Sequence, residues 1–416
     1  MMGIGQALKQ RSHVAMAIVV LSLCFMFNMA GRGVGDTYIV FLLPLGQEFG
    51  WSRSEMSSVY SIYMLTSGLS APFVGVLFDR WGPKVVYSCG LICLGIGYVL
   101  ASKLSQLWQF YICVGVLGGI GVSALGMVPA ASLVSRWFPS STATAISIAY
   151  AGLGCGTLLI VPLAQYLNQI MGWRASYEML GSALLLLFPL IFLLPWRLIR
   201  AGRPNDLKQF PELVVPTSGK SFGQAIRTRA FWSLAQLFFF TAVAMYAMII
   251  QTIVYLMDNG LSPLEAASAF GMAGMLSVIG VTGTGFLADR IGYRRTAMVS
   301  FICTFLGVTL LLALSYYHTR WLVIGFVVLF GIAQGARGPI VSSLCAKLFP
   351  GGSLATIYGA IYACMSIGAA LGALGSGLLH DLSGGYRASF VLSMISVLFA
   401  AAPFWTSSAL TKFEDS

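Results

Sequence analysis

The chain has 416 residues, of which 58% are hydrophobic and only 9% are charged. Soluble domains carry about 25% charged residues, so this composition excludes a soluble globular protein and predicts a polytopic membrane protein. The formal net charge of +11 would suit a nucleic-acid partner, but the basic residues gather in the loops between apolar segments. Because that distribution is typical of membrane topology, we expect no nucleic-acid partner.

Twelve apolar segments are long enough to cross a bilayer as helices, which takes about 20 residues each. They lie at 14–45, 55–78, 85–101, 108–134, 142–170, 175–198, 231–257, 264–287, 297–315, 321–345, 353–379 and 386–407. Connections are short except for one polar stretch that contains three prolines. The predicted domains are an N-terminal six-helix half (1–198), a cytoplasmic linker (199–230) and a C-terminal six-helix half (231–416).

The first apolar segment carries two opposite charges near its middle, in Gly31-Arg32-Gly33-Val34-Gly35-Asp36. A charge at that depth costs about 2.5–3.5 kcal/mol on insertion scales, so an intramembrane ionisable group indicates a functional site. The spacing places Arg32 and Asp36 on one helix face. The alternating glycines carry no side chains, so the helix is narrow there and its backbone is easy to distort. The alternative is an ion pair within the helix that only makes the segment insertable.

Two loop sequences recur at nearly one offset. Gly75-Val-Leu-Phe-Asp79-Arg80-Trp-Gly82 follows the second span, and Gly285-Phe-Leu-Ala-Asp289-Arg290-Ile-Gly292 follows the eighth, 210 residues later. Arg136-Trp-Phe138-Pro139 and Lys347-Leu-Phe349-Pro350 follow spans 4 and 10, with an offset of 211. Two separate matches at almost the same offset indicate that the halves are duplicates.

The basic residues also orient the chain. With the N-terminus placed in the cytoplasm, 17 of the 24 Lys and Arg residues fall on the cytoplasmic side and 5 on the outer side, while Arg32 and Arg337 lie within spans. Cytoplasmic loops carry an excess of Lys and Arg, so we expect both termini in the cytoplasm and the chain in the inner (plasma) membrane.

At the repeated Gly-x-Leu-x-Asp-Arg-x-Gly loops the chain resembles a major facilitator superfamily transporter, and the resemblance covers nearly the whole chain. It implies an all-α polytopic membrane protein with twelve transmembrane helices in two six-helix pseudo-symmetric halves. It also implies a conformational latch in which the loop residues hold the cytoplasmic helix ends. Here the latch residues would be Gly75, Asp79, Arg80, Gly285, Asp289 and Arg290.

A narrower resemblance links the chain to monocarboxylate transporters and bacterial oxalate–formate antiporters. It rests on Val40 to Ser52 at the end of span 1, Trp137 to Gly156 in span 5, and Arg229-Ala-Phe231-Trp232 at the start of span 7. That group's arginine in span 8 has no counterpart, since its position falls near Val281. The oxalate transporter's lysine in span 11 is also absent, so the substrate site is not transferable from that group.

Arg337 and Arg32 are therefore the candidate substrate-binding cations. Arg337 lies in Gly335-Ala-Arg337-Gly338-Pro339, where we expect a bend, and arginine suits a carboxylate because of its planar fork of N–H donors. Its alternative is a structural arginine. Asp36 is the candidate proton-coupling residue, because burial favours the protonated carboxyl whereas a neighbouring arginine favours the ionised form. A permanently ionised partner of Arg32 is the alternative.

Uncharged residues complete the candidate substrate site, although plain packing explains each tyrosine as well. Tyrosine rings with hydroxyl groups suit the wall of a pocket for a small organic acid. The set comprises Gln251, Tyr150, Tyr246, Tyr358 and Tyr362.

These observations predict a secondary active transporter of a small organic anion, a monocarboxylate by preference, that works by alternating access with a proton as candidate coupling ion. An exporter of drugs or neutral metabolites is the first alternative, and a transporter-like solute receptor is a distant one. No nucleophile elbow, nucleotide-binding Gly-x-x-x-x-Gly-Lys loop or Cys/His metal-ligand spacing occurs in the sequence. We therefore expect no enzyme activity, metal or cofactor, and a monomer in the lipid bilayer.

Overall fold

The structure is a computed structural model that describes residues 4–51, 53–202, 220–407 and 410. Every regular element in these ranges is a helix, and eleven of the helices are long and apolar enough to cross a membrane. One of them, α8 (Thr142–Leu193), has 52 residues but contains the non-helical Gly172, with φ 78° and ψ 168°. A continuous helix of that length would measure about 78 Å, more than twice the hydrocarbon thickness of a bilayer. Gly172 therefore divides α8 into two spans, and the predicted all-helical fold with twelve spans is confirmed.

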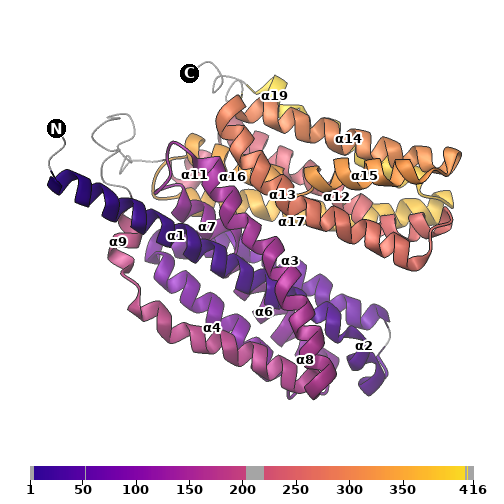
Figure 1. Cartoon of the computed structure of the whole chain (residues 1–416), viewed down its shortest axis with the longest axis horizontal. Helices are drawn as coiled ribbons and strands as arrows, with labels where there is room; N and C mark the ends of the chain where they lie inside the picture. The colour runs from indigo at the N-terminus through magenta and orange to yellow at the C-terminus, as the bar shows by residue number, and fades with distance from the viewer. Residues whose placement is uncertain (1–3, 52, 203–219, 408–409, 411–416) are drawn as a thin grey trace. The chain divides into compact units, whose positions relative to one another are not determined.

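The first of two compact units comprises Met1–Ser221 together with Phe349–Gly359. Its helices α1, α3, α4 and α8 run side by side in Figure 1, and α8 packs against both α1 and α4. Its remaining elements are shorter. The helices are α1 (Ile4–Asp36), α2 (Tyr38–Phe49), α3 (Arg53–Trp81), α4 (Pro83–Ala101), α5 (Leu107–Phe110), the π-helix η1 (Tyr111–Leu117), α6 (Gly118–Leu125), α7 (Met127–Val134), α8 and α9 (Trp196–Ala201).

The second unit comprises Phe222–Leu348 and Ala360–Ser416. Its core joins α12, α13, α14, α15 and α18 around buried Phe326, Phe330 and Phe390. The helices are α11 (Phe222–Ala225), α12 (Arg229–Asp258), α13 (Pro263–Ile291), α14 (Tyr293–Tyr317), α15 (Arg320–Ala333), α16 (Arg337–Leu348), α17 (Leu354–Ser383), α18 (Arg387–Ala401) and α19 (Pro403–Thr406). Helix α17 begins in the first unit and continues in the second. Most of the predicted linker, at 203–219, lies outside the described residues.

Two spans are interrupted at equivalent places in the two units. Span 4 breaks at Gly126 between α6 and α7, and span 10 breaks between Ala333 and Arg337, where Gly335 has a φ of 78°. The bend expected at Gly338-Pro339 is therefore displaced toward Gly335. Pro339 instead lies in the first turn of α16, where its missing N–H leaves no helical hydrogen bond unmade. Glycine at 335 is needed because a left-handed φ is costly for other residues.

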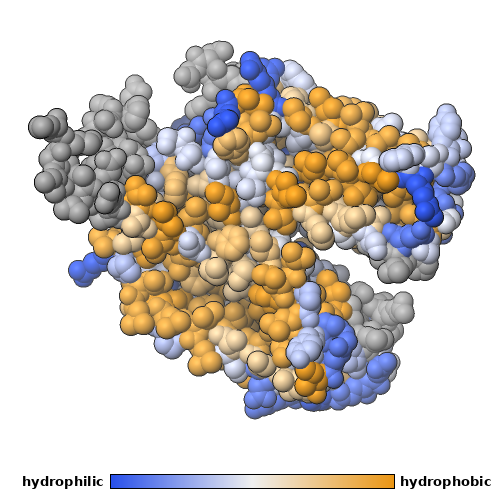
Figure 2. Space-filling model, viewed as in Figure 1, coloured by the Kyte–Doolittle hydropathy of each residue, from blue (hydrophilic) through white to orange (hydrophobic). Residues whose placement is uncertain are grey.

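The surface is that of a protein surrounded by lipid. In Figure 2 hydrophobic residues cover the sides of the helix bundles and hydrophilic residues gather toward the helix ends. Large apolar side chains such as Phe73, Leu186 and Leu374 are exposed in both units. Contiguous apolar surface of this extent is incompatible with water and fits a bilayer.

Candidate functional site

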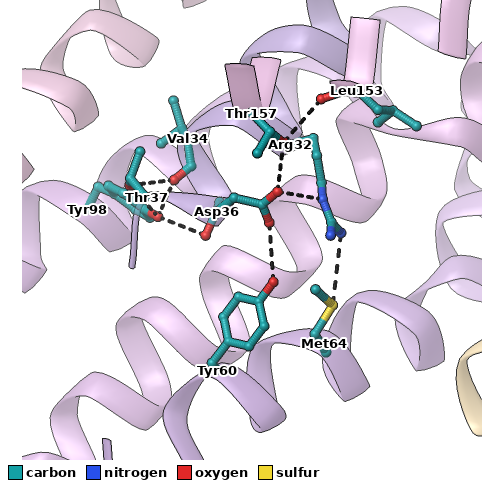
Figure 3. Close-up of polar contacts among 10 residues, drawn as sticks. Arg32, Val34, Asp36, Thr37, Tyr60, Met64, Tyr98, Leu153 and Thr157 are labelled. Atoms are coloured by element: carbon teal, nitrogen blue, oxygen red, sulfur yellow. Dashed lines mark hydrogen bonds and ion pairs between the residues drawn. The ribbon is translucent and has the colours of Figure 1, made fainter. Parts of the chain in front are cut away.

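The charged pair of span 1 forms a cluster at the end of α1, which stops at Asp36 (Figure 3). Arg32 Nε lies 2.9 Å from Asp36 Oδ2, so the contact predicted from the i,i+4 spacing is present. The Asp36 side chain is 6% exposed and the Arg32 side chain 29%. Thr157 Oγ1 of α8 also donates to Asp36 Oδ2 at 2.9 Å, and the Tyr60 hydroxyl of α3 donates to Oδ1 at 3.4 Å. Three helices therefore hold one buried carboxylate.

The interruption after Asp36 is stabilised by hydrogen bonds to the carbonyls that it frees. The Val34 carbonyl oxygen accepts from the hydroxyl groups of Thr37 and Tyr98, each at 2.6 Å. A continuous helix over 14–45 was expected, but the span is divided here into α1 and α2. The division places Asp36 at the last residue of a helix rather than in its middle.

The glycines beside Arg32 and Asp36 allow neighbouring helices to approach closely. A methyl group on Gly33 would lie 2.7 Å from the Gly156 carbonyl oxygen of α8 and 2.6 Å from Ile160 Cδ1. A methyl group on Gly35 would collide with the Tyr63 hydroxyl of α3. Both approaches are closer than any side chain tolerates, so glycine is required for the three helices to converge on Asp36.

Sequence reasoning missed Thr157 and Tyr60, as well as Met64, whose sulfur accepts from Arg32 Nη1 at 3.9 Å. Tyr60 and Met64 lie one helical turn apart on α3 and therefore share one helix face. This spacing is the signal in the sequence that could have indicated them. Their pairing with span 1 arises from tertiary packing, which the spacing of residues in a single chain does not encode.

Arg337 has a different environment, at the start of α16 in the second unit. Its side chain is buried, with the residue 2% exposed, and Nη2 donates to the Ser300 carbonyl oxygen at 2.9 Å and to Thr304 Oγ1. The Phe301 ring lies 4.5 Å from the guanidinium carbon. Within the described part of the chain, Nε and Nη1 have no hydrogen-bond partner and no acidic group pairs with Arg337. Three of its five N–H donors are thus unused.

The candidate tyrosines are distributed over both units. In the first unit the Tyr150 and Tyr358 hydroxyl oxygens lie 3.1 Å apart, and Tyr150 donates to the Met127 carbonyl at 3.2 Å, beside the break in span 4. In the second unit Tyr362 packs edge-on against Phe238 at 6.4 Å. Tyr246 packs on the core of that unit, and Gln251 lies half-buried on α12.

The repeated loops place their aspartates at helix ends. Asp79 accepts hydrogen bonds from the backbone N–H groups of Ala355 and Thr356, at 3.3 and 2.8 Å, and from the Thr356 hydroxyl at 2.7 Å. These groups begin α17, so the carboxylate binds where the helix dipole favours negative charge. A methyl group on Gly75 would collide with the Ala355 carbonyl, which explains the glycine.

Basic residues around these loops stack on aromatic rings. Arg290 lies 4.2 Å from the Phe286 ring centroid, and the Tyr293 hydroxyl donates to Asp289 at 3.3 Å. Arg80 is exposed, whereas burial lowers the pKa of Arg136 in the loop after span 4, an effect that the Asp79 charge opposes. Gly285 is buried. The latch role of these residues stays a prediction.

No group of three or more potential metal ligands occurs among the described residues, whose cysteines are all free. Membrane-spanning helices in two units, with ionisable groups buried inside them, define a polytopic membrane protein. The chain belongs to the Major Facilitator Superfamily, whose family model matches residues 21–285 and 283–412. It is accordingly a secondary transporter and not an enzyme.

The chain is similar to other transporters over most of its length and over most of theirs. The chain is 28% identical to monocarboxylate transporter 13 of Bos taurus, over 90% of this chain and 85% of the relative. It is 25% identical to the uncharacterized MFS-type transporter YcxA of Bacillus subtilis, over 94% of this chain and 95% of the relative. The structure of the proton:xylose symporter XylE aligns with a TM-score of 0.78 at 13% identity, covering 95% of this chain and 96% of that one. That likeness establishes the fold alone.

Proposed function

We propose that the protein transports a small organic anion, a monocarboxylate by preference, and that Arg337 binds its carboxylate. The observation that carries this proposal is a buried guanidinium with three unused N–H donors and no acidic partner among the described residues. A buried cation without a counter-ion is costly, and an anionic ligand that accepts those hydrogen bonds removes the cost. The likeness to proteins named monocarboxylate transporters supports the same class of substrate.

Asp36 is the proposed proton carrier. It is a buried carboxylate that accepts hydrogen bonds from a neighbouring arginine and two hydroxyls. When those donors approach, the ionised form is favoured, and when they withdraw, burial favours the neutral form. Alternation between these arrangements during transport would load and release a proton.

The remaining candidates have supporting roles in this proposal. The further proposed substrate-binding residues are Arg32, Tyr150 and Tyr358 in the first unit and Tyr246, Gln251 and Tyr362 in the second, and the two Asp-Arg loops are the proposed conformational latch. The transporter acts as a monomer in the inner (plasma) membrane with both termini cytoplasmic. A single cysteine placed at the exposed Lys220 should react with an impermeant reagent only after cells are permeabilised, and labelling of intact cells would contradict this orientation.

Counterflow in proteoliposomes tests the substrate class. Vesicles loaded with one acid are assayed for uptake of the same labelled acid, against a panel that includes each acid's amide as a neutral analogue of nearly the same shape. We expect exchange of monocarboxylates and none of the amides. Exchange of neutral solutes in preference to acids would contradict the proposal and favour the exporter alternative.

A further inference from the structure

The two oxygens of Asp36 are bound unequally. Oδ2 accepts from Arg32 Nε and from Thr157 Oγ1, each at 2.9 Å, whereas Oδ1 accepts from the Tyr60 hydroxyl at 3.4 Å. Protonation of Oδ2 would set a new O–H against two donors that already point at it. Oδ1 has one long hydrogen bond, and the Tyr60 hydroxyl oxygen can accept as well as donate. A proton carried by Asp36 would therefore bind at Oδ1.

The Thr157 hydroxyl has a choice of two acceptors. It lies 2.9 Å from Asp36 Oδ2 and 3.3 Å from the Leu153 carbonyl oxygen, one turn earlier in α8 (Figure 3). A hydroxyl has one proton to donate. While Asp36 is ionised, the charge-assisted bond to Oδ2 is the stronger one. Once Asp36 is neutral, the bond to the backbone carbonyl competes on equal terms.

We propose that Thr157 is a positioning residue whose hydroxyl sets the proton affinity of Asp36, by donating to the carboxylate when it is ionised and to the Leu153 carbonyl when it is neutral. This inference rests on the proposed role of Asp36 as proton carrier. Thr157 is the exposed member of the cluster, whereas Asp36 is buried. The hydroxyl thus couples the protonation state of a buried group to the surface of α8.

Other titratable groups surround Asp36, and all of them are retained when Thr157 is substituted. Arg32 lies on the same helix, and the helices that pack around the site contribute tyrosines. These are Tyr60 and Tyr63 of α3 and Tyr98 of α4, all within electrostatic reach of the carboxylate. The residues at the site from α6 and α8, Val122 and Thr157, do not titrate. A shift on substitution of Thr157 therefore reports the loss of its hydroxyl.

Infrared difference spectroscopy of the reconstituted full-length protein measures this directly. The stretching band of the protonated Asp36 carboxyl is followed against pH and assigned by its loss in Asp36→Asn. In Thr157→Val the shape is kept but the donor to the ionised form is lost, so the titration midpoint should move to higher pH by roughly half a unit to one unit. Thr157→Ser keeps the hydroxyl and should titrate like the wild type.

An unmoved midpoint in Thr157→Val, or an equal shift in Thr157→Ser, would overturn the role of Thr157. If Thr157→Val does not fold, Thr157→Ala removes the same hydroxyl and should raise the midpoint likewise, and an unmoved midpoint there would also overturn the role of Thr157. Tyr60→Phe tests the assignment of the two oxygens. Loss of its long bond to Oδ1 should raise the midpoint by less than a lost bond at Oδ2, and a larger shift would contradict the assignment of the oxygens. The spectroscopic titration needs no transport. A carboxyl that titrates as expected in a protein without proton-coupled uptake would refute the proposed role of Asp36 as proton carrier alone.

Discussion

Arg32 and Arg337 each place a positive charge within a membrane span, but different groups stabilise the two charges. Arg32 is paired with Asp36 one turn along its own helix, and its side chain is 29% exposed. Arg337 is 2% exposed and is held by a backbone carbonyl, a threonine hydroxyl and an aromatic ring. A charge that its own helix neutralises is inserted at little cost. A charge that is buried without an acid is the one that we propose for binding the substrate.

The energetic consequence differs accordingly. Removing Arg32 would leave the buried Asp36 charge uncompensated, which costs about 3–5 kcal/mol, whereas removing Asp36 leaves the partly exposed Arg32, whose side chain is 29% exposed. At Arg337 no acidic partner exists among the described residues, so substitution leaves no charge behind in the protein. A single substitution at Arg337 can therefore affect binding without affecting folding. At Arg32, the two effects can be separated only when Asp36 is substituted as well.

The largest effect is expected for Arg337→Ala. Truncating one partner of a buried, hydrogen-bonded charge pair costs about 2–5 kcal/mol, so binding of a carboxylate substrate should weaken by roughly 30-fold or more. Arg337→Lys should restore only part of it, because lysine lacks the planar fork. Counterflow and direct binding in detergent measure both variants at equal protein level.

Arg387→Ala is the matched control for this substitution. It removes the same charge from the second unit, where the exposed Arg387 stacks on Tyr316 at 5.0 Å. The control should transport normally. Undiminished uptake by Arg337→Ala would eliminate Arg337 as the carboxylate ligand, and the buried arginine would then be a structural feature of α14 and α16.

Next comes Asp36→Asn, which imitates the protonated carboxyl permanently. Exchange of substrate needs no net proton movement and should be retained, whereas accumulation driven by a pH gradient should be lost. The dependence of exchange on pH should flatten as well, because the group that titrates is gone. Counterflow and gradient-driven uptake in the same vesicles separate the two activities. Accumulation that persists in this variant would remove Asp36 from proton coupling.

Much of the architecture could be predicted from the sequence. Hydropathy and the repeated loops predicted twelve spans in two halves, because a bilayer imposes both the length and the composition of each helix. The helical period also predicted that Arg32 meets Asp36. The predicted spans 142–170 and 175–198 end on either side of Gly172, which is where the structure divides α8.

What could not be predicted depends on contacts between helices. Thr157 and Tyr60 meet Asp36 because Gly33 and Gly35 bring α8 and α3 close, and no pattern within one span encodes that meeting. The sequence predicts a bend in the stretch from Gly335 to Pro339, and the structure places it at Gly335, which adopts the left-handed backbone, and not at Pro339. A proline in the first turn of a helix is compatible with it, so the position of a proline alone does not locate a break.

A smaller and more specific effect separates pairing from function at Arg32. Arg32→Gln leaves the carboxylate without its cation and should reduce both expression and exchange. The double variant Arg32→Gln/Asp36→Asn removes both charges and should recover exchange, with a coupling of about 0.5–3 kcal/mol between the sites in thermal stability. If the double variant is as defective in exchange as Arg32→Gln, Arg32 has a function besides neutralising Asp36, and direct substrate contact becomes its assignment.

The smallest effect is expected for Phe301→Leu, which tests how Arg337 is held. The ring lies 4.5 Å from the guanidinium carbon in a buried setting, where a cation–π contact contributes about 0.5–2 kcal/mol. Leucine keeps much of the apolar volume but loses the electron-rich face, so the half-saturating substrate concentration should rise roughly 2- to 30-fold with the maximal rate nearly unchanged. Tyr316→Leu is the matched control, since it removes the ring beneath the exposed Arg387 and should alter neither value. A change confined to the maximal rate in Phe301→Leu would mean that the ring affects the conformational cycle rather than substrate binding. The guanidinium would then be oriented by the Ser300 carbonyl and Thr304 alone, because these are the remaining groups on α14 that contact it.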